Sequence, residues 1–261
     1  MVRTIANMAE PLITKINHPI KVFVLSNYQK DGLWLNNGNV IFVDSIEECD
    51  VLILPGGSDI HPKYYNQKKA VLTRVGPEYV DEQEREAIEK AVSLNKFIIG
   101  ICKGGQWCNV FNGGIMIQHV NHHSIGRYHH IKDSDTGEVI LVNSMHHQMM
   151  FPYYLPKDEY KLIAYSKQPY FDIENISHFS YIGEDDKQFT PIGTTLSLKD
   201  DRKFMEPEII WFPKTKCFAV QFHPEMMSLE SQGVKYLNKR IIPLLFKHLQ
   251  SKLELTSRHH E

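Results

Sequence analysis

The sequence predicts an α/β fold in which a mainly parallel central sheet is flanked by helices. Short apolar runs that end in turns alternate with segments whose apolar residues recur at helical spacing. Three of these runs, at residues 20–25, 51–54 and 97–101, are apolar except for Lys21, as strands buried on both faces of a parallel sheet largely are. Ligand sites of such sheets lie at the carboxyl ends of the strands, so we expect the functional site there.

The first half of the chain supplies these strands and one long helix. Between the first two runs, residues 40–43 form another short apolar segment. A helix is expected over residues 78–94, where apolar side chains follow a helical spacing and charged side chains occupy the other face. The chain then returns to a strand at residues 97–101.

After Gly114 the sequence pattern changes to short strand-like segments followed by one helix. A closing helix is expected over about residues 229–253. The pieces before it are short and strand-like, at residues 138–142, 161–165, 208–212 and 218–222.

Without an internal repeat or a low-complexity linker, the sequence favours a single domain. We place this domain at residues 20–253, after an N-terminal extension at 1–19 and before a C-terminal tail at 254–261. Residues 166–206 form a long polar stretch that is rich in aromatic and acidic side chains. This stretch is either a lid over the site, as an insertion, or an irregular excursion on the surface.

Composition narrows the classes of partner. The 29 basic and 31 acidic residues nearly cancel and are interspersed, so no strong field would recruit nucleic acid or an anionic membrane. The sequence has neither a long apolar span nor an apolar signal segment, and its four cysteines lack the density of a disulfide scaffold. We therefore expect a cytoplasmic protein that acts on small polar molecules and has at least one free thiol.

Cys102 is the candidate nucleophile. It follows an apolar strand, has Gly100 two residues before it and Gly104 two residues after it, and precedes a predicted helix. This is the cysteine form of the nucleophile elbow, in which glycines give clearance to a strained turn. The N-terminus of a helix also favours the thiolate form. The alternative is a structural cysteine in a turn, the interpretation that we give to Cys49, Cys108 and Cys217 because they lack this clearance.

A thiol nucleophile needs a histidine to handle the proton of the leaving group and a carboxylate to orient that histidine. Among the 14 histidines, only His223 both follows a strongly apolar strand and precedes Pro224 and Glu225. Proline stiffens the turn and can hold the Glu225 carboxylate against the imidazole. A purely structural histidine at a strand end is the alternative.

The loop at residues 55–59 ends a strand that we expect beside the elbow strand. Its paired glycines allow a backbone N–H to approach a substrate oxygen, and together with the N–H of Lys103 it would form an oxyanion hole. The alternative is an ordinary Pro-Gly-Gly turn.

Seven histidines lie within thirty residues and raise the question of a metal site: His119, His122, His123, His129, His130, His146 and His147. Because no acidic or cysteine residue joins them in a known metal-binding spacing, we favour polar loop histidines near the substrate entrance. We therefore predict no metal and no other cofactor.

Five segments together resemble class I glutamine amidotransferases, most closely the gamma-glutamyl-gamma-aminobutyrate hydrolase (peptidase C26) branch. They occur in the order of that family and extend over most of the chain, at residues 54–62, 100–106, 109–114, 142–148 and 220–225. The resemblance implies a flavodoxin-like fold with a nucleophile elbow. The chain departs from the family at Gly105, where a larger residue is usual, and in the length of residues 166–206.

The resemblance also implies roles for the site residues. Cys102 would be the nucleophile, His223 the base and Glu225 its orienting carboxylate, with oxyanion N–H groups from Gly57 and Lys103. Three further residues would contact the substrate: Gln106 at the amide, and Ser144 with His146 at the glutamyl end.

Three functions are consistent with this set of residues. The first is a hydrolase that cleaves the γ-amide of glutamine or of a γ-glutamyl compound through a glutamyl thioester. The second is a glutaminase subunit that delivers ammonia to a separate synthetase partner. The third is a catalytically silent glutamine-binding module, which the presence of Cys102, His223 and Glu225 disfavours.

Overall fold

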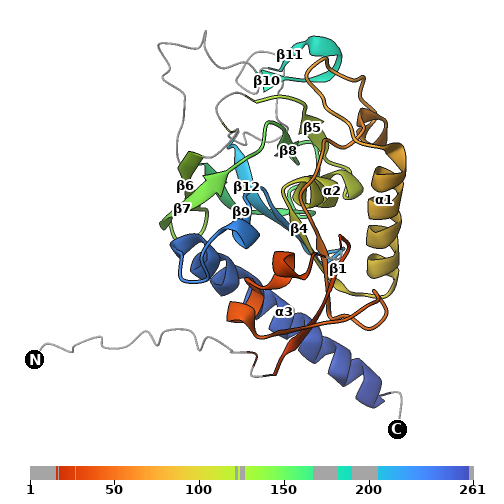
Figure 1. Ribbon diagram of the computed structural model, residues 1–261, viewed down its shortest axis with the longest axis vertical. Helices are drawn as coiled ribbons and strands as arrows, with labels where there is room; N and C mark the ends of the chain where they lie inside the picture. Colours follow the sequence, from red (N-terminus) through yellow and green to blue (C-terminus); the bar gives the residue numbers. More distant parts are fainter. Residues whose placement is uncertain are drawn as a thin grey trace, which may run out of the picture.

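A nine-stranded mixed sheet organises the molecule in the computed structural model (Figure 1). The structure describes residues 16, 18–26, 28–120, 123, 127–166, 181–189 and 205–258. The strands are β1 (Ile20–Val24), β2 (Val40–Phe42), β3 (Val51–Leu54), β4 (Phe97–Ile101), β5 (Ile115–Ile117), β6 (Arg127–Asp133), β7 (Val139–Ser144), β8 (Met149–Phe151), β9 (Lys161–Ser166), β10 (Tyr181–Ile182), β11 (Gln188–Phe189), β12 (Pro207–Phe212) and β13 (Cys217–Val220). The α-helices are α1 (Glu78–Ser93), α2 (Lys103–Phe111) and α3 (Gln232–Arg258).

The large sheet has a parallel half and an antiparallel half. Its order is β2-β1-β3-β4-β13-β12-β9-β6-β7. The first five strands pair in parallel, and every pairing from β13 to β7 is antiparallel. The predicted α/β class with a parallel central sheet is confirmed. The strands that carry the elbow and the loop at residues 55–59, β4 and β3, are neighbours.

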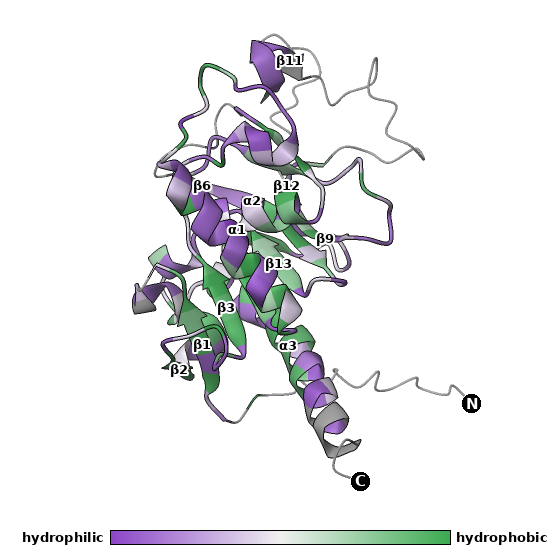
Figure 2. Cartoon of the chain, turned by 90° about the vertical axis from the view of Figure 1, so that its right-hand side faces the viewer, coloured by the Kyte–Doolittle hydropathy of each residue, from purple (hydrophilic) through white to green (hydrophobic). Residues whose placement is uncertain are grey.

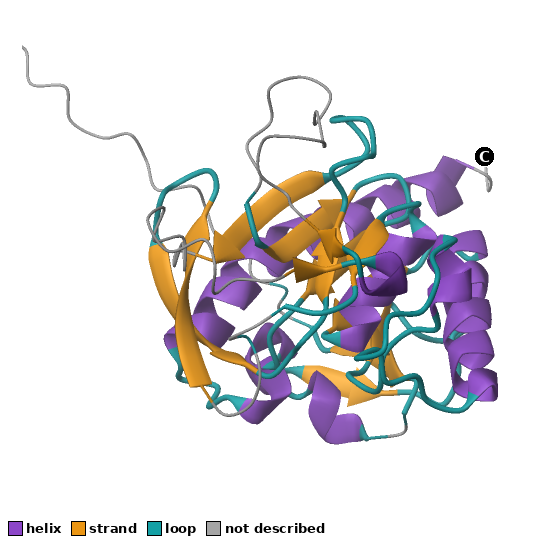
Figure 3. Ribbon diagram, turned by 90° about the horizontal axis from the view of Figure 1, so that it is seen from above, coloured by secondary structure: helices purple, strands orange, loops and turns teal. Residues whose placement is uncertain are grey.

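Helices cover both faces of the parallel half (Figures 1 and 3). In β3, Val51 and Ile53 belong to the core cluster that includes residues of α3, whereas Leu52 and Leu54 belong to the cluster that includes residues of α1 and α2. All four side chains are fully buried, and each such burial stabilises the fold by roughly 1.5–3 kcal/mol. In Figure 2, which colours residues by hydropathy, β3 is green because its residues are hydrophobic. The apolar run is therefore a strand covered on two faces, as predicted.

Two boundaries differ from the sequence prediction. Helix α3 starts at Gln232 and continues to Arg258, so residues 254–258 of the expected tail are helical. Ile16, from the expected N-terminal extension, is buried in the α3-side core, and its carbonyl accepts a hydrogen bond from Asn36. None of the helices in the described residues combines the length and the hydrophobicity that are needed to cross a bilayer.

Most of the stretch at residues 166–206, which we predicted to be either a lid or a surface excursion, lies outside the described residues. The described part includes the hairpin of β10 and β11, which has the short 3-10 helix Glu184–Asp186 at its tip. Glu184 accepts a hydrogen bond from the backbone of Lys68, and Asp186 accepts one from Val71. These contacts tie the hairpin to the loop that precedes α1.

Candidate active site

Cys102 lies at the sharp turn between β4 and α2. Its backbone has φ of 51° and ψ of −106°, a conformation that costs a residue with a Cβ of order 1–3 kcal/mol. The residue is the N-cap of α2 and is 7% exposed, whereas the other three cysteines are at most 1% exposed. The predicted strained elbow is present, and Cys102 is the most accessible of the four thiols.

Glycines provide the clearance that this turn requires. A Cβ on Gly100 would overlap the backbone of Gly104, and a Cβ on Gly104 would overlap the carbonyl of Leu54. A Cβ on Gly105 would lie 2.6 Å from the carbonyl oxygen of Val220, on the adjacent strand β13. The departure at Gly105 therefore has a local cause, because α2 packs too closely on β13 for any side chain there.

His223 lies beside Cys102. Its Nδ1 is 2.6 Å from the Glu225 carboxylate, which is carried by the short 3-10 helix Pro224–Met226. A Cβ on Gly56 would lie 2.7 Å from Cε1 of His223 and 3.5 Å from Cβ of Cys102, so the two side chains meet over this glycine. The structure thus brings the predicted Cys, His and Glu together.

The environment of His223 favours its protonated form. Burial lowers the pKa of the imidazole, but interactions with Cys102 and Glu225 outweigh burial and raise this pKa to about 10. A charged imidazole between a thiol and a carboxylate can donate a proton to a leaving group.

Asn143, which sequence reasoning did not select, holds the backbone of His223. Its Oδ1 accepts a hydrogen bond from the His223 N–H at 2.8 Å, and its Nδ2 donates to the His223 carbonyl at 2.8 Å. Asn143 is in β7, at the far edge of the sheet, and is 8% exposed. Asn143 lies within the segment 142–148 that resembles the family. Its contact with His223, however, depends on the return of the chain to residue 223.

The two residues predicted to supply the oxyanion N–H groups, Gly57 and Lys103, pack against each other. A Cβ on Gly57 would lie 3.1 Å from Cδ of Lys103, so the loop after β3 packs on the first residue of α2. The Gly104 N–H donates to the Pro55 carbonyl at 3.1 Å and fixes the two segments together. No described residue accepts a hydrogen bond from the backbone N–H of Gly57 or Lys103, and their assignment as oxyanion donors stays a prediction.

The side chain of Lys103 lies in a buried ion-pair network. It is 2% exposed, and its Nζ lies 2.8 Å from Asp81 and 2.6 Å from Glu84, both in α1. Glu84 also accepts a hydrogen bond from the indole of Trp107 at 2.7 Å. This buried network fastens the first turn of α2 to α1 and so fixes the residue that follows the nucleophile.

The three residues predicted to contact substrate are all buried. Gln106 Nε2 lies 3.5 Å from the carbonyl oxygen of Gln148, and Ser144 donates to the carbonyl of His123 at 2.8 Å. Nδ1 of His146 also bonds the Gln148 carbonyl, at 2.8 Å. All three are at most 3% exposed, and their assignment to substrate binding stays a prediction.

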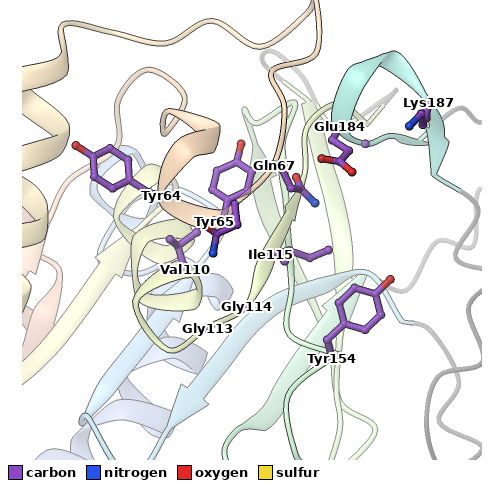
Figure 4. A pocket seen from close by; sticks show the side chains of 12 residues that line it. Tyr64, Tyr65, Gln67, Val110, Gly113, Gly114, Ile115, Tyr154, Glu184 and Lys187 are labelled. Atoms are coloured by element: carbon purple, nitrogen blue, oxygen red, sulfur yellow. The ribbon is translucent and has the colours of Figure 1, made fainter.

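A cavity of about 500 Å³ lies away from the elbow (Figure 4). It is lined by Tyr65 and Gln67, by Val110 and Gly113 at the C-terminal end of α2, and by Glu184 of the β10–β11 segment. Because the nine residues of α2 rise by about 13 Å, this cavity is separated from Cys102 by the length of that helix. None of the predicted site residues lines it.

Three of the histidines that we interpreted as polar loop residues near the substrate entrance are buried instead. His123, His129 and His146 are buried, and each lies beside a carboxylate of Glu206 or Glu208. The acidic partners precede and begin β12, some sixty residues or more along the chain, where no local spacing could reveal them. His130 is exposed, and His122 lies outside the described residues.

The remaining two histidines of the set form another group. His147 Nε2 is 2.9 Å from Asp59, in the loop after β3, and His147 Nδ1 is 3.3 Å from Nδ1 of His119. His147 is partly exposed, with 26% of its side chain accessible. This group is the part of the histidine set that fits the expected surface position.

Sheet order and the strand-to-helix elbow define a class I glutamine amidotransferase fold, with a cysteine at the elbow. The family model described as peptidase C26 matches residues 32–178. This match extends over more than half of the 261 residues, and the chain belongs to the peptidase C26 family.

Curated relatives are similar over parts of the chain. A glutamine amidotransferase-like protein of Rickettsia prowazekii is 40% identical over 76 residues, which are 29% of this chain and 27% of that protein. A glutamine amidotransferase-like protein named YvdE, from Lactococcus lactis, is 30% identical over 119 residues, which are 39% of this chain and 50% of that protein. The chain therefore spans half or less of the length of these relatives.

Among solved structures, similarity extends over nearly the whole chain. A protein of Thermoplasma acidophilum, provisionally named as a GMP synthase subunit, superposes with a TM-score of 0.53 over 92% of this chain and 98% of its own. The two sequences are 17% identical, so this likeness establishes the fold alone.

Proposed function

We propose that this protein is a cysteine-dependent hydrolase that cleaves the γ-amide of glutamine or of a γ-glutamyl compound. The observation that carries the proposal is the meeting of Cys102 with the His223–Glu225 pair at the strained elbow. Membership of the peptidase C26 family supports a hydrolase of the glutamine amidotransferase type.

In the first half of the reaction, Cys102 acts as the thiolate, with its proton on His223, and its sulfur attacks the γ-carbonyl carbon of the substrate. The carbonyl oxygen becomes an oxyanion, for which the N–H groups of Gly57 and Lys103 are the proposed donors. Protonated His223 then gives its proton to the leaving nitrogen, and the C–N bond breaks. The products of this half are a glutamyl thioester on Cys102 and a free amine or ammonia.

In the second half, neutral His223 takes a proton from water, and the resulting oxygen nucleophile attacks the thioester carbon. The C–S bond breaks, glutamate leaves, and Cys102 and protonated His223 are restored. Glu225 keeps the imidazole in one orientation during both halves, since its carboxylate lies 2.6 Å from Nδ1.

A product assay with the purified protein alone tests this proposal. Glutamine, γ-glutamyl amines and γ-glutamyl peptides are incubated separately, and mass spectrometry follows both glutamate and the released nitrogen compound. Glutamate formation from at least one γ-glutamyl compound is expected. If only glutamine reacts, and only when a synthetase partner is added, the chain is instead the glutaminase subunit of a larger enzyme.

Labelling by a glutamine analogue that alkylates thiols tests the nucleophile separately. Cys102 is expected to react first, because it is the most exposed of the four thiols and the one at a helix N-terminus. Burial raises the pKa of Cys49 to about 11, which keeps that thiol protonated at neutral pH. Peptide mapping after brief labelling decides the question, and earlier labelling of Cys49, Cys108 or Cys217 would contradict the assignment.

A further inference from the structure

A cluster of buried imidazoles and carboxylates lies in the antiparallel half of the sheet, outside the proposed catalytic set. It is assembled from a residue before β6, a residue in β6, a residue after β7, the residue before β12 and a residue in β12. We call it the His–Glu cluster, and its members are His123, His129, His146, Glu206 and Glu208. Each is at most 8% exposed, and Glu208 is fully buried.

Three ligand atoms in this cluster face one another. Nδ1 of His123 lies 4.0 Å from Oε1 of Glu208, and Nε2 of His146 lies 3.7 Å from the same oxygen. One ligand atom from each of the three residues falls within a span of 4.8 Å. These separations are too long for hydrogen bonds but suit atoms that share a central ion.

Nδ1 of His123 and Nε2 of His146 also lack hydrogen-bond partners within the described part of the chain. Among the described residues, neither Nδ1 of His123 nor Nε2 of His146 has a hydrogen-bond partner, although His123 is 4% and His146 3% exposed. Buried polar nitrogen atoms normally have a partner, and each one left without a partner costs about 1–3 kcal/mol. A ligand between these atoms would remove that cost.

The opposite nitrogen of each ring is already held in the manner of a metal ligand. Nε2 of His123 lies 3.3 Å from the Glu206 carboxylate, and Nδ1 of His146 lies 2.8 Å from the Gln148 carbonyl. Histidines that bind metals typically donate their other N–H to a carboxylate or a carbonyl, which leaves a lone pair on the nitrogen that faces the ion. His129 also lies beside Glu208, with its Nε2 3.0 Å from Oε1 of that carboxylate.

Charge supports the same ligand. Two carboxylates, Glu206 and Glu208, lie in this buried space, and buried charge is costly unless it is paired. The imidazoles balance it only if they bind protons, and a divalent cation balances it directly. Two imidazoles and one carboxylate are a donor set that zinc binds readily.

We infer that His123, His146 and Glu208 form a binding site for a divalent cation of the zinc class. Bonds of about 2 Å at a tetrahedral ion place ligand atoms about 3.4 Å apart, so shifts of about 1 Å or less per side chain would close the site. The fourth position falls to the second oxygen of Glu208, which has no hydrogen-bond partner among the described residues, or to water.

The place of this site in the fold points to a structural role next to the catalytic histidine. His146 follows Asn143 by three residues, and Asn143 holds the backbone of His223 through two hydrogen bonds. The His146 N–H and the Ser144 hydroxyl both donate to the carbonyl of His123. A cation bound here would fasten the end of β7, and with it the Asn143 contact, to β12.

Zinc binding by the intact protein tests the inference. Protein prepared without an affinity tag is stripped with a chelator, dialysed and titrated with Zn²⁺, and bound zinc is then counted by mass spectrometry of the elements. We expect about one zinc per chain and a higher melting temperature in its presence. The same is expected of Cys102→Ala, which removes the competing thiol site at Cys102 and His223.

Variants locate the site. His146→Ala and Glu208→Gln should bind zinc at least about tenfold more weakly, whereas His130→Ala should bind it like the wild type, because His130 is exposed on the same strand as His129. Zinc binding that survives unchanged in both ligand variants would overturn the inference. So would wild-type protein that binds no zinc and shows no change in melting temperature.

Absorption spectroscopy of the wild-type protein with bound cobalt tests the same inference if the variants fail to fold. Co²⁺ added to the stripped wild-type protein should give visible absorption bands of a tetrahedral site with nitrogen and oxygen ligands. An intense thiolate-to-cobalt band in the near ultraviolet would place the metal on a cysteine and overturn the assignment to His123, His146 and Glu208.

Discussion

The two halves of the sheet each hold a group of titratable side chains, and these groups differ in how they are built. In the parallel half, Cys102, His223 and Glu225 come from two short sequence motifs at adjacent strand ends. In the antiparallel half, the His–Glu cluster is drawn from residues up to 85 positions apart, from His123 to Glu208. Both groups are buried, but only the first includes a strained backbone, at Cys102.

The proposed catalytic residues and the buried polar residues that hold segments together thus occupy different halves of one sheet. Side chains at the ends of parallel strands converge at one edge, where a substrate can reach them. The antiparallel strands place their polar groups inside, where these groups hold segments together. Asn143 is the link between the groups, because it lies in β7 and bonds the backbone of His223. Changes in the first group should therefore alter rate, and changes in the second should alter stability.

The largest effect is expected for Cys102→Ala. Removal of the nucleophile should lower turnover of a γ-glutamyl substrate by at least about a thousandfold. Stability should change little, since the thiol lies at a strained turn and contributes little packing. Turnover and thermal melting are measured on the same sample, with Cys49→Ala as a control that removes a buried thiol elsewhere. Substantial turnover by Cys102→Ala would refute the covalent mechanism.

Glu208→Gln should have the largest effect on stability. Loss of the charge leaves the surrounding imidazoles without their common partner, and breaking a buried pair costs about 3–5 kcal/mol. Urea denaturation gives the free energy of unfolding, and Glu230→Gln is the control because the Glu230 side chain is 83% exposed. Equal stability of the two variants would mean that the cluster supports nothing.

Glu225→Gln should change the pH dependence of the reaction. The raised pKa of His223, about 10 against an ordinary 6.5, means that protonated His223 contributes stability below pH 6.5 and that this contribution is lost as the pH rises through about 10. Activity that needs the protonated imidazole should decline in the same range. In Glu225→Gln the alkaline limb of kcat/KM should move to lower pH, and kcat/KM should fall about a hundredfold.

The position of the alkaline limb is the decisive measurement for this variant. A merely structural glutamate would change the height of the pH profile without moving its alkaline limb. Glu230→Gln again serves as the control, since it lies on the same segment and is exposed.

The smallest effect is expected for Gly56→Ala. The added Cβ would lie 2.7 Å from Cε1 of His223 and would push the imidazole away from Cys102 by a fraction of an ångström. Displacements of this size lower turnover by about tenfold. Gly57→Ala is the comparison, because its Cβ would meet the flexible Cδ of Lys103 at 3.1 Å and should cost less. A larger loss in Gly57→Ala than in Gly56→Ala would show that the position of the imidazole is not limiting.

The sequence by itself determined the parallel half of the fold and the proposed catalytic set. The elbow depends on Gly100, Cys102 and Gly104, and the histidine with its carboxylate depends on residues 223–225, so each is specified within a few residues. Apolar strands that are buried on both faces must lie side by side, and their carboxyl ends then meet at one edge. Local pattern and a general rule of sheets were therefore enough to bring Cys102 and His223 together.

The contacts between polar side chains of different elements follow from the tertiary structure and not from local sequence patterns. The burial of Lys103 against Asp81 and Glu84 depends on the packing of α2 on α1, and the Asn143 contact depends on the return of the chain at His223. The His–Glu cluster depends further on the order of β12, β9, β6 and β7. Strand order and register are set by the sum of many weak contacts, and a shift of one residue turns a side chain to the opposite face, so no local spacing encodes them.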